Sequence, residues 1–585
     1  MNDTTRQISR RQLLAGAGLG TAGAVLGAVS LSTSAAQAQD KWDYTTDIVA
    51  VGGGSAGLTA ACAAVSEGDN VIVLEKGPVI GGTTAKSGGV FWIPNHFALR
   101  ENGVDDAKAD CMRYLCRFSY PERYTPTSPT LGLEEPEYAL LEAFYDNGAA
   151  GVDRMREIGA LSSMQWRIWG ADKLAPDYFD HAPENKVPYG RPLGPQAADG
   201  SLGRGTDMIE QLAAYVTGRG SRILTDHRAM RLVLNDPGEV VGLEAETEGR
   251  TITVRARKAV VFGSGGYAHN PAFIRRYQRN HSFGSCATGL ATGDFIEIAG
   301  AAGAQFGNLS GAWRAQVLVE ECLKNPRLPA CVFYPPGDSM IQVNRVGRRV
   351  VNEKRNYNDR TEIHFGYNPT DEDFSNRLLF MIFDQRTREA FAGAYPLPPP
   401  ARQSPFMIEG KTFAELARNI EARLAQLASH TGNFSLDAEF SEHLETTVKQ
   451  FNDYARSGQD PDHHRGAQRY DREWAGLFSP MHPDTTRPEN DLTNPTMHPF
   501  EADGPYFAFI LGAGVLDTNG GPVINEKAQV LGASGQPIPG LYGAGNCIAN
   551  PSREAYYGAG GTIGVAFTFG YIAGVNAHRE PVKAI

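Results

Sequence analysis

The fold of this chain is decided by residues 46–95, TDIVAVGGGSAGLTAACAAVSEGDNVIVLEKGPVIGGTTAKSGGVFWIPN. An apolar run at 48–51 is followed by a glycine-rich turn, a helical pattern of small residues at 58–66, and a second apolar run at 71–74. Short apolar runs predict buried strands, and the small residues between them predict a helix packed closely on the sheet. The order strand, turn, helix, strand is typical of an α/β fold that binds a nucleotide.

Three glycines in the turn, Gly52, Gly54 and Gly57, have the spacing of the dinucleotide fingerprint. Gly52 permits a sharp turn after the strand, Gly54 lets backbone amides approach a pyrophosphate, and Gly57 lets the helix lie close to the sheet. The free amides at the helix start, around Ser55 and Ala56, are expected to hold the phosphate charge with the help of the helix dipole.

An acid follows at the distance that the fingerprint requires. Glu75 ends the second apolar run, 18 residues after Gly57, and is expected to accept the ribose hydroxyls. A plain glycine turn between two core elements is the alternative, because such loops are common. Spacing, flanking strands and acid all agree, however, and they favour a bound nucleotide.

A second segment of glycines and hydroxyl residues, at 81–89, indicates which nucleotide is bound. A nicotinamide dehydrogenase has no use for such a segment, whereas a flavin needs backbone amides and hydroxyls along its isoalloxazine edge. The sequence therefore predicts FAD. The cofactor-binding residues expected in this region are Lys76, Gly82, Thr83, Thr84, Ser87, Gly88 and Gly89.

The two glycine segments together resemble the flavoproteins grouped with fumarate reductase and succinate dehydrogenase. The form Gly-Gly-Thr-Thr-Ala, Ser-Gly-Gly and Trp-Ile-Pro-Asn at 81–95 resembles 3-ketosteroid dehydrogenases most. The resemblance extends from about Asp47 to about Ala577 and is weakest at 99–205. It implies a discontinuous Rossmann-like FAD-binding domain at 39–312 and 502–585, with an α+β substrate or capping domain inserted at 313–501.

The resemblance also implies how FAD is held. Covalent relatives attach the flavin through a histidine after the second strand, and 81–89 contains none, so non-covalent FAD is expected. Asp294 opens a predicted helix and has two interpretations that are compatible, a flavin contact and a helix cap. The further residues that the resemblance places at the cofactor are Gly265, Asp294, Gly545, Asn546, Thr562 and Ile563.

Three catalytic residues follow from the same resemblance. Tyr357, shortly before Asp359 and Arg360, takes the position of the family's base. Tyr556 and the amide of Gly560 take the position of the donors to the substrate carbonyl. Because the pKa of a free tyrosine is ~10, Tyr357 must share its proton with a neighbour or have a lowered pKa. Arg355 or Arg360 is expected to help.

The family also has an assisting tyrosine in a loop that corresponds to 164–195. Here either Trp166 or Lys173 falls at that position, depending on how the aromatic segment around Tyr178 is aligned. No role is transferred to any residue of this loop. Its large aromatic residues predict either a substrate wall or ordinary packing.

The function implied is an FAD enzyme that desaturates a cyclic ketone, either a 3-ketosteroid or a smaller cyclohexanone-type ring. The alternative is a periplasmic, fumarate-reductase-like enzyme that reduces an unsaturated acid. That chemistry needs arginine and histidine around a carboxylate, and the segment after Gly545 reads Asn-Cys-Ile-Ala-Asn-Pro-Ser instead. A non-catalytic flavin carrier is the third hypothesis.

Residues 1–38 resemble a twin-arginine export signal. Arg10 and Arg11 precede an uncharged run rich in alanine and glycine, which ends in the small-residue cleavage pattern Ala36-Gln37-Ala38. We therefore expect a periplasmic or otherwise extracytoplasmic protein. An uncleaved anchor is the alternative, and a peripheral membrane contact stays open as well.

Composition excludes some partners and cofactors. Residues 1–38 carry three arginines and one aspartate, so the net charge of −11 becomes −13 without them. An acidic protein of this kind does not favour nucleic acid as a partner. The 7 cysteines have neither metal nor haem spacing, so we expect no metal site. Electrons should therefore pass to a separate acceptor, a quinone or a redox protein.

Overall fold

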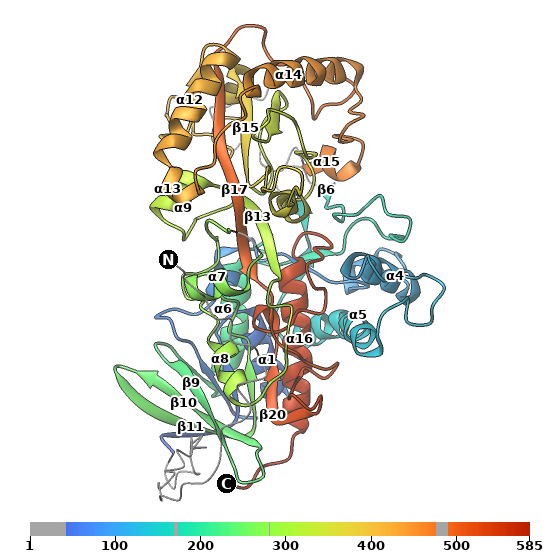
Figure 1. Cartoon of the computed structure of the whole chain (residues 1–585). Helices are drawn as coiled ribbons and strands as arrows, with labels where there is room; N and C mark the ends of the chain where they lie inside the picture. Colours follow the sequence, from blue (N-terminus) through green and yellow to red (C-terminus); the bar gives the residue numbers. More distant parts are fainter. Residues whose placement is uncertain (1–41, 169–172, 280, 475–489) are drawn as a thin grey trace, which may run out of the picture.

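The computed structural model describes residues 42–168, 173–279, 281–474 and 490–585. The predicted export signal lies outside these residues. Figure 1 shows two lobes, one above the other. We call the lower one the nucleotide lobe, built on an 8-stranded sheet, and the upper one the cap lobe, built on a 5-stranded sheet.

The nucleotide lobe contains the predicted strand, turn, helix and strand as β1 (Tyr44–Val51), α1 (Ser55–Ser66) and β2 (Val71–Leu74). β1 pairs in parallel with β2 on one side and with β11 (Arg250–Phe262) on the other. β20 (Pro537–Gly543) and β8 (Arg222–Leu224) extend this parallel order. The carboxyl ends of all these strands therefore meet at one edge of the sheet, where α/β folds bind ligands.

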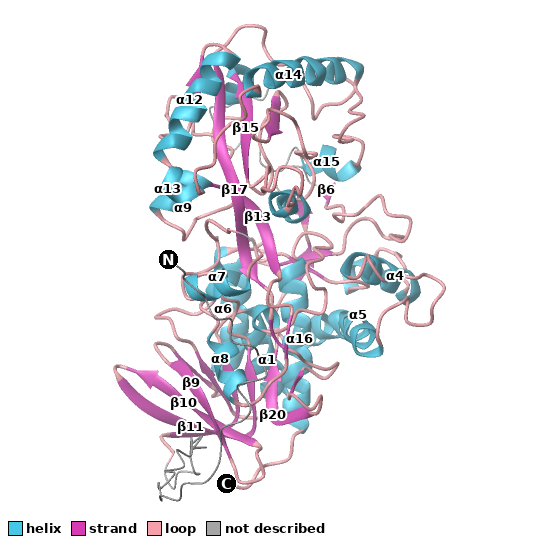
Figure 2. Cartoon of the chain, viewed as in Figure 1, coloured by secondary structure: helices cyan, strands magenta, loops and turns pink. Residues whose placement is uncertain are grey.

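An antiparallel extension completes the sheet. β10 (Val240–Thr247) pairs with β11 and with β9 (Arg228–Leu234), and β19 (Gln529–Leu531) pairs with β20. β9, β10 and β11 form the long ribbon at the bottom of Figure 2.

Two small-residue helices pack on the parallel strands. α16 (Gly561–Arg579) lies against α1, and a Cβ on Gly574 would meet the Ala60 carbonyl oxygen at 2.3 Å. Only glycine allows the two helices to approach this closely.

A group of helices lies beside the nucleotide sheet. Three of them are α3 (Phe97–Glu101), α4 (Lys108–Ser119) and α5 (Glu135–Glu157). α6 (Gly205–Thr217) and α8 (Asp294–Ala301) also cover this lobe. α7 (Pro271–Tyr277) lies near the junction of the lobes in Figure 1. The short strands β3 (Phe91–Trp92), β4 (Ser163–Gln165) and β7 (Pro192–Pro195) form a small separate sheet.

The cap lobe is an antiparallel sheet flanked by helices. Its central strand β17 (Tyr506–Thr518) pairs with β13 (Ala312–Leu318) and β15 (Leu378–Asp384), and β14 (Met340–Val343) and β16 (Ile408–Gly410) complete the sheet. The flanking helices include α12 (Phe413–Gln426), α13 (Ala428–Thr431) and α14 (Phe440–Ser457). Shorter helices complete the lobe: α9 (Val319–Lys324), α10 (Tyr357–Thr361), α11 (Gln385–Ala390) and α15 (Arg469–Glu473).

The lobes meet at places that differ in part from the expected domain boundaries. β13 begins at Ala312, next to the expected start of the inserted domain at 313. The return, expected at 502, comes later, because all of β17 belongs to the cap sheet and runs down into the nucleotide lobe (Figure 1). In addition, Trp166 and Tyr178 pack in the cap core although they precede the insertion.

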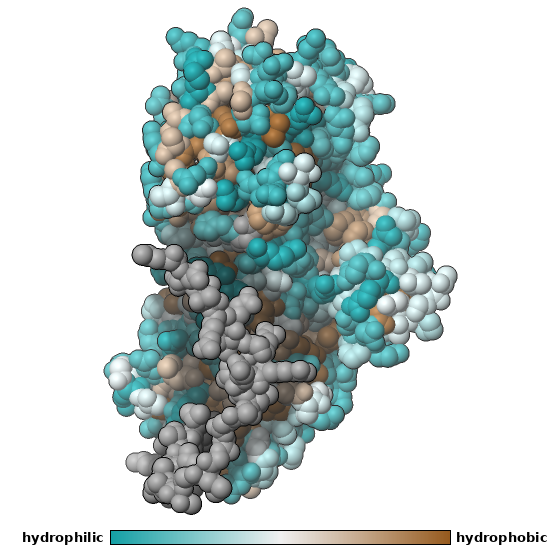
Figure 3. Space-filling view, viewed as in Figure 1, coloured by the Kyte–Doolittle hydropathy of each residue, from teal (hydrophilic) through white to brown (hydrophobic). Residues whose placement is uncertain are grey.

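The visible surface of the cap lobe is largely hydrophilic, with hydrophobic residues in small patches (Figure 3). Within the described residues, every helix is too short or too polar to serve as a membrane span.

Candidate active site

A cavity of about 480 Å³ lies between the two lobes. Its walls come from the glycine turns at the carboxyl edge of the parallel strands and from aromatic residues of the cap core. Most of the predicted site residues line it: Gly52, Gly54, Ser55, Ala56, Glu75, Lys76, Gly82, Thr83, Thr84, Ser87, Gly88, Gly265, Asp294, Tyr357, Gly545, Asn546, Tyr556, Gly560, Thr562 and Ile563.

Gly57 and Gly89 do not line this cavity, and both act through the backbone instead. A Cβ on Gly57 would lie 2.0 Å from the Gly52 carbonyl oxygen, so α1 can follow the turn only with glycine there. Gly89 has φ +72°, and a Cβ on it would lie 2.6 Å from the Gly205 nitrogen. The structure therefore assigns these two glycines to shaping the cavity rather than to lining it.

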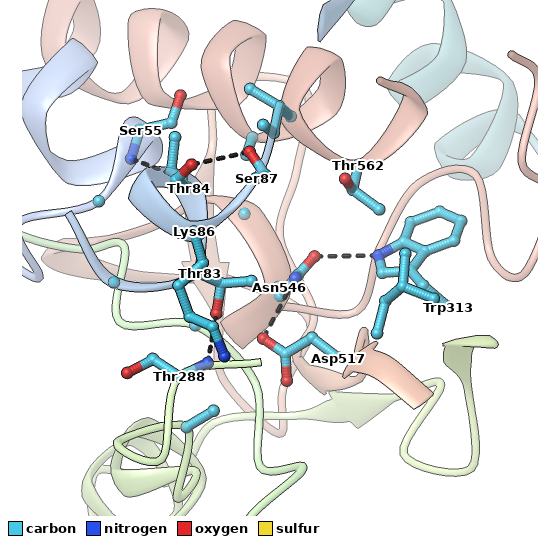
Figure 4. A pocket seen from close by; sticks show the side chains of 18 of the residues that line it. Ser55, Thr83, Thr84, Lys86, Ser87, Thr288, Trp313, Asp517, Asn546 and Thr562 are labelled. Carbon is cyan, nitrogen blue, oxygen red and sulfur yellow. Dashed lines mark hydrogen bonds between the residues drawn. The ribbon is translucent and has the colours of Figure 1, made fainter. Parts of the chain in front are cut away.

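The first glycine turn presents free polar groups to the cavity. The cap residue of α1, Gly54, has no side chain to satisfy the first amides of the helix. The Ser55 N–H donates to Thr84 Oγ1 at 3.3 Å (Figure 4). The hydroxyls of Ser55 and Ser264 are buried without a hydrogen-bond partner in the described part of the chain. Buried hydroxyls are normally satisfied, so these groups point to a polar ligand such as a pyrophosphate.

Glu75 is fixed by its own surroundings. One carboxylate oxygen accepts from the Gly53 N–H at 2.9 Å and the other from the Gly77 N–H at 2.8 Å. Each oxygen keeps a further lone pair, so the carboxylate can still accept the ribose hydroxyls. The two backbone bonds hold it in place for that role.

Asp294 and Lys76 form an ion pair at the same end of the cavity. The Lys76 ammonium donates to Asp294 at 3.2 Å and to the Thr292 hydroxyl at 2.7 Å. Burial alone would raise the pKa of Asp294, but hydrogen bonds from Arg228 and the charge of Lys76 outweigh it and lower this pKa. Asp294 is the first residue of α8, but Gly293 holds the cap position and no side chain among the described residues caps the helix, so Asp294 lines the cavity and is not the cap.

The second glycine segment forms the short helix α2 (Gly82–Lys86), whose hydroxyls bind neighbouring backbone. The Ser87 hydroxyl donates to the Thr84 carbonyl at 2.7 Å, and the Thr288 N–H donates to the Thr83 hydroxyl at 3.1 Å (Figure 4). The Lys86 ammonium donates to the Ala287 carbonyl at 3.2 Å. These bonds hold the segment along the cavity and leave its backbone facing inward.

A chain of polar side chains at the floor of the cavity includes a residue that sequence reasoning missed. The Trp313 indole donates to the Asn546 side chain at 3.0 Å, and the Asn546 amide donates to Asp517 at 3.3 Å (Figure 4). Burial raises the pKa of Asp517 to about 6, although hydrogen bonds from Gly266 and Asn546 oppose the shift. Asp517 is that residue, because it is absent from the cofactor-binding residues expected from the sequence.

These features fit FAD. The glycine turn and the Ser55 hydroxyl suit the pyrophosphate, Glu75 suits the ribose, and the backbone of α2 and of the α16 start suits the isoalloxazine. The α16 amides would also place a positive helix end near the reduced flavin.

The other end of the cavity contains three tyrosines in contact. The Tyr178 hydroxyl donates to the Tyr357 hydroxyl at 3.1 Å. The Tyr178 and Tyr556 rings stack with centroids 5.3 Å apart, and the Tyr357 ring meets the Tyr556 ring edge-on at 5.3 Å. The structure therefore brings the predicted base and the predicted carbonyl donor together.

The pKa values in this cluster differ from the expectation that Tyr357 has a lowered proton affinity. Burial raises the pKa of Tyr357 and of Tyr178 well above the usual value. Burial also raises the pKa of Tyr556, and hydrogen bonds with Tyr357 and Thr562 oppose that shift.

The arginines expected to help Tyr357 are engaged elsewhere. The guanidinium of Arg360 donates to Gln316 and to backbone carbonyls, including that of Val332 at 2.7 Å. Arg355 forms an ion pair with Asp471 at 3.1 Å. The proton of Tyr357 is therefore shared with neighbouring tyrosines rather than drawn off by arginine.

Tyr178 is the second residue that sequence reasoning missed, and the structure explains how it is held. Its N–H donates to the Tyr557 carbonyl at 2.9 Å. Its neighbour Asp177 is buried and forms an ion pair with Arg191 at 2.5 Å. The aromatic residues of this loop predict either a substrate wall or ordinary packing. Their spacing in the sequence does not indicate which of them contacts Tyr357.

Gly560 closes this end of the cavity next to Tyr556. It has φ +85°, and a Cβ there would lie 2.5 Å from the Val90 carbonyl oxygen, so only glycine fits. Its carbonyl accepts from the Trp92 N–H at 3.0 Å, while no residue in the described part of the chain accepts from its own N–H. The Gly560 amide is thus a free donor on the cavity wall.

Comparisons with known proteins agree with this site. Residues 47–563 match the family model described as an FAD binding domain. The chain is 29% identical over 569 residues to 4-oxocyclohexanecarboxylate 2-dehydrogenase of Sinomonas cyclohexanicum, covering 91% of this chain and 92% of that protein. It is 28% identical over 590 residues to 3-oxosteroid 1-dehydrogenase of Mycolicibacterium smegmatis, covering 91% and 96% respectively.

A solved structure has the same fold. It is 3-ketosteroid Δ1-dehydrogenase from Sterolibacterium denitrificans in complex with 1,4-androstadiene-3,17-dione, with a TM-score of 0.74 and 23% identity, covering 92% of this chain and 99% of that one. The predicted family resemblance, fold class and cofactor are confirmed. The chain therefore belongs to the family described as the FAD binding domain and is an FAD-dependent oxidoreductase, with the fold of the solved ketosteroid dehydrogenase.

Proposed function

We propose that the protein introduces a carbon–carbon double bond next to the carbonyl of a cyclic ketone. One observation supports the proposal: Tyr357, Tyr556 and Gly560 all line the cavity, the Tyr357 and Tyr556 rings are in contact, and no described residue accepts from the Gly560 N–H. A base and two carbonyl donors are the groups that removal of a proton alpha to a ketone requires.

Tyr556 and Gly560 would hold the carbonyl oxygen. Both are donors on a buried wall, and both are fixed, Tyr556 by its stacked ring and Gly560 by the start of α16. Negative charge grows on this oxygen as the enolate forms, so fixed donors stabilise the transition state more than the bound ketone. Each such donor typically contributes about 2.7–4 kcal/mol.

Tyr357 would take the alpha proton. As a tyrosinate, its oxygen would be stabilised by the hydroxyl of Tyr178, which already donates to it at 3.1 Å. This bond offsets in part the cost of charge in a buried site. When bound, FAD supplies the acceptor for the hydride that leaves the beta carbon.

The named relatives support a ketone substrate. One is named as a dehydrogenase of 4-oxocyclohexanecarboxylate and another as a dehydrogenase of 3-oxosteroids. Both substrates have a six-membered ring bearing a ketone. We therefore propose a cyclohexanone-type ring or a 3-ketosteroid for this protein.

The reductase alternative finds less support in the cavity. Among the described lining residues, His227 lies at the nucleotide end, where its N–H donates to the Glu75 carbonyl at 2.9 Å. Arg204 lies beside the second glycine segment, since a Cβ on Gly89 would contact its backbone. The described residues near Tyr357 are mainly aromatic, and they suit a neutral ring better than a dicarboxylate.

The test uses the purified FAD-loaded protein under anaerobic conditions. Adding cyclohexanone, 4-oxocyclohexanecarboxylate or a 3-ketosteroid should bleach the flavin absorbance with at least one of them, and the enone product should appear by mass spectrometry. Fumarate should fail to reoxidise the chemically reduced protein. Rapid reoxidation by fumarate without bleaching by any ketone would favour the reductase instead.

We also propose that the protein is exported by the twin-arginine route and passes its electrons to a quinone or a redox protein. The Arg10-Arg11 pair and the Ala36-Gln37-Ala38 pattern support export. The exported protein should have a new amino terminus near residue 39, and Arg10→Lys with Arg11→Lys should retain it in the cytoplasm. Fractionation and mass spectrometry of the terminus test this proposal.

A further inference from the structure

The substrate end of the cavity contains a buried donor that the proposed reaction does not use. Trp474 lines the cavity and is 5% exposed. Its indole Nε1 is buried and has no hydrogen-bond partner among the described residues. Since buried donors are normally satisfied by protein, water or ligand, this N–H requires a partner that the described part of the chain does not supply.

Trp474 belongs to the same aromatic cluster as the carbonyl donor Tyr556. The Tyr178 ring stacks on Tyr556 with centroids 5.3 Å apart, and it meets the Trp474 ring edge-on at 5.8 Å. Trp474 and Tyr556 both line the cavity, and each contacts Tyr178. A ring whose ketone is held at Tyr556 can therefore present another of its atoms to Trp474.

The indole is also held rigidly. Trp474 follows directly after α15, and its ring packs between Trp166 at 5.9 Å and Tyr470 at 5.4 Å. α15 is anchored by Asp471, which accepts from Asn352 at 2.9 Å and from the Gly466 N–H at 3.0 Å. A fixed donor loses little entropy when it binds a ligand atom, so it discriminates well between ligands.

We propose that Trp474 determines specificity by donating its indole N–H to a second oxygen of the substrate, on the side of the ring remote from the ketone. The inference rests on the proposed function and narrows its substrate class. The preferred substrate is a cyclic ketone that carries a hydroxyl, carbonyl or carboxylate oxygen away from the reacting carbons, rather than a plain hydrocarbon ring.

The experiment compares two ketones that differ in this oxygen, 4-hydroxycyclohexanone and 4-methylcyclohexanone. Trp474→Phe keeps an aromatic ring and removes the N–H. It should raise the dissociation constant and lower kcat/KM for the hydroxyl ketone by about 5- to 10-fold, the usual worth of one hydrogen bond. The methyl ketone should be affected less than twofold. Binding is measured by the change in flavin absorbance and turnover with a dye acceptor.

Two further variants control the comparison. Trp474→His restores a ring N–H and should recover part of the preference for the hydroxyl ketone. Trp42→Phe removes another buried indole donor that has no partner among the described residues, on a residue that does not line the cavity, and should change the binding and turnover of neither ketone.

The outcomes separate this inference from the proposed function. Equal losses with both ketones in Trp474→Phe, or equal affinity of the parent protein for both, would overturn the role of Trp474 while leaving desaturation intact. Binding of both ketones without turnover would contradict the proposed function, and the two dissociation constants would still decide the role of Trp474. Failure of both ketones to bind would overturn the inference as well.

Discussion

The tyrosine cluster combines two demands that oppose each other. A carbonyl donor must keep its proton, and burial helps Tyr556 to do so by raising its pKa. A base must lose its proton, and burial raises the pKa of Tyr357 well above the usual value. The Tyr178 hydroxyl donates to Tyr357 and would donate to the tyrosinate as well, whereas burial and the neighbouring tyrosines raise the pKa of Tyr357.

The first prediction concerns Tyr357→Phe, which should retain FAD while turnover falls by about 10²–10⁴-fold, the usual contribution of a positioned base. The parent enzyme should also show a pH dependence with a definite sign. Because the reactive form is the tyrosinate and its pKa is raised, kcat/KM should increase with pH and reach no plateau below about pH 10. Steady-state kinetics across pH check both statements.

Tyr178→Phe provides the matched control for this prediction. It keeps the ring against Tyr556 and removes only the hydroxyl that donates to Tyr357. The rise of kcat/KM should then shift to higher pH. A variant Tyr357→Phe with the activity of the parent would show that Tyr357 only packs.

The second prediction compares two neighbouring tyrosines. Tyr556→Phe should lower turnover by about 10²–10³-fold with little change in apparent substrate affinity, because the lost hydroxyl acts mainly in the transition state and Gly560 still holds the oxygen. Tyr557 does not line the cavity, and its hydroxyl bonds Ser119 at 2.5 Å. Tyr557→Phe should leave turnover nearly unchanged and cost about 1 kcal/mol of stability. The reverse pattern would show that Tyr557, rather than Tyr556, donates to the carbonyl.

At the scale of single residues, the sequence predicted site residues within recognisable motifs better than site residues in loops. Tyr357 and Tyr556 lie in segments whose neighbours match a known pattern, and both line the cavity. Tyr178 reaches Tyr357 across 179 residues, and an ion pair between Asp177 and Arg191 holds its loop in place. Contacts of this kind depend on tertiary packing, and local spacing does not reveal them.

The elements that hold the cofactor are connected by glycines that allow close backbone contacts. α1 starts directly after β1, and its first turn touches the backbone of the turn that precedes it. The start of α16 meets β3 in the same way, through Gly560 and the backbone of Val90. Helix starts can therefore point their free amides at the cavity because no side chain stands between the elements.

The third prediction belongs to this scale. Gly57→Ala places a Cβ 2.0 Å from the Gly52 carbonyl oxygen, a backbone atom that cannot move without moving β1. The variant should purify with less than a tenth of the parent's FAD, or should fold poorly. Gly68→Ala is the control in a turn with open space, although its φ of +94° adds some strain. Flavin content and circular dichroism of both variants give the answer, and full flavin content in Gly57→Ala would contradict the argument.

The order of the elements was predictable because periodicity is a local property. Apolar runs became buried strands, as at β1 and β2, and amphipathic stretches became helices, as at α12 and α14. The return from the cap lobe was placed too early, since β17 is one continuous strand that serves the cap sheet and then enters the nucleotide lobe. The amino-acid composition does not change at the point where such a strand passes from one lobe to the other.

At the scale of the whole molecule, the cofactor cavity lies between the two lobes. Ala56 lines it from the nucleotide core and Tyr357 from the cap core. A ligand that contacts both lobes stabilises their mutual arrangement as well as each lobe, because it binds only the assembled state. FAD is therefore expected to act as a structural bridge in addition to its chemical role.

The last prediction is that FAD is bound without a covalent bond and supports the stability of both lobes. The segment 81–89 has no histidine, and His227, which lines the cavity, lies at the Glu75 end rather than near the tyrosines. Acid precipitation should therefore release all the flavin into the supernatant, and flavin that stays with the polypeptide would contradict this. Restoring FAD to the apoprotein at about 100 times its dissociation constant should add about 2.7 kcal/mol to the free energy of unfolding. Because the cavity joins the lobes, calorimetry should show the transitions of both lobes moving to higher temperature together; a shift of the nucleotide lobe alone would mean that the cap lobe gains nothing from the cofactor.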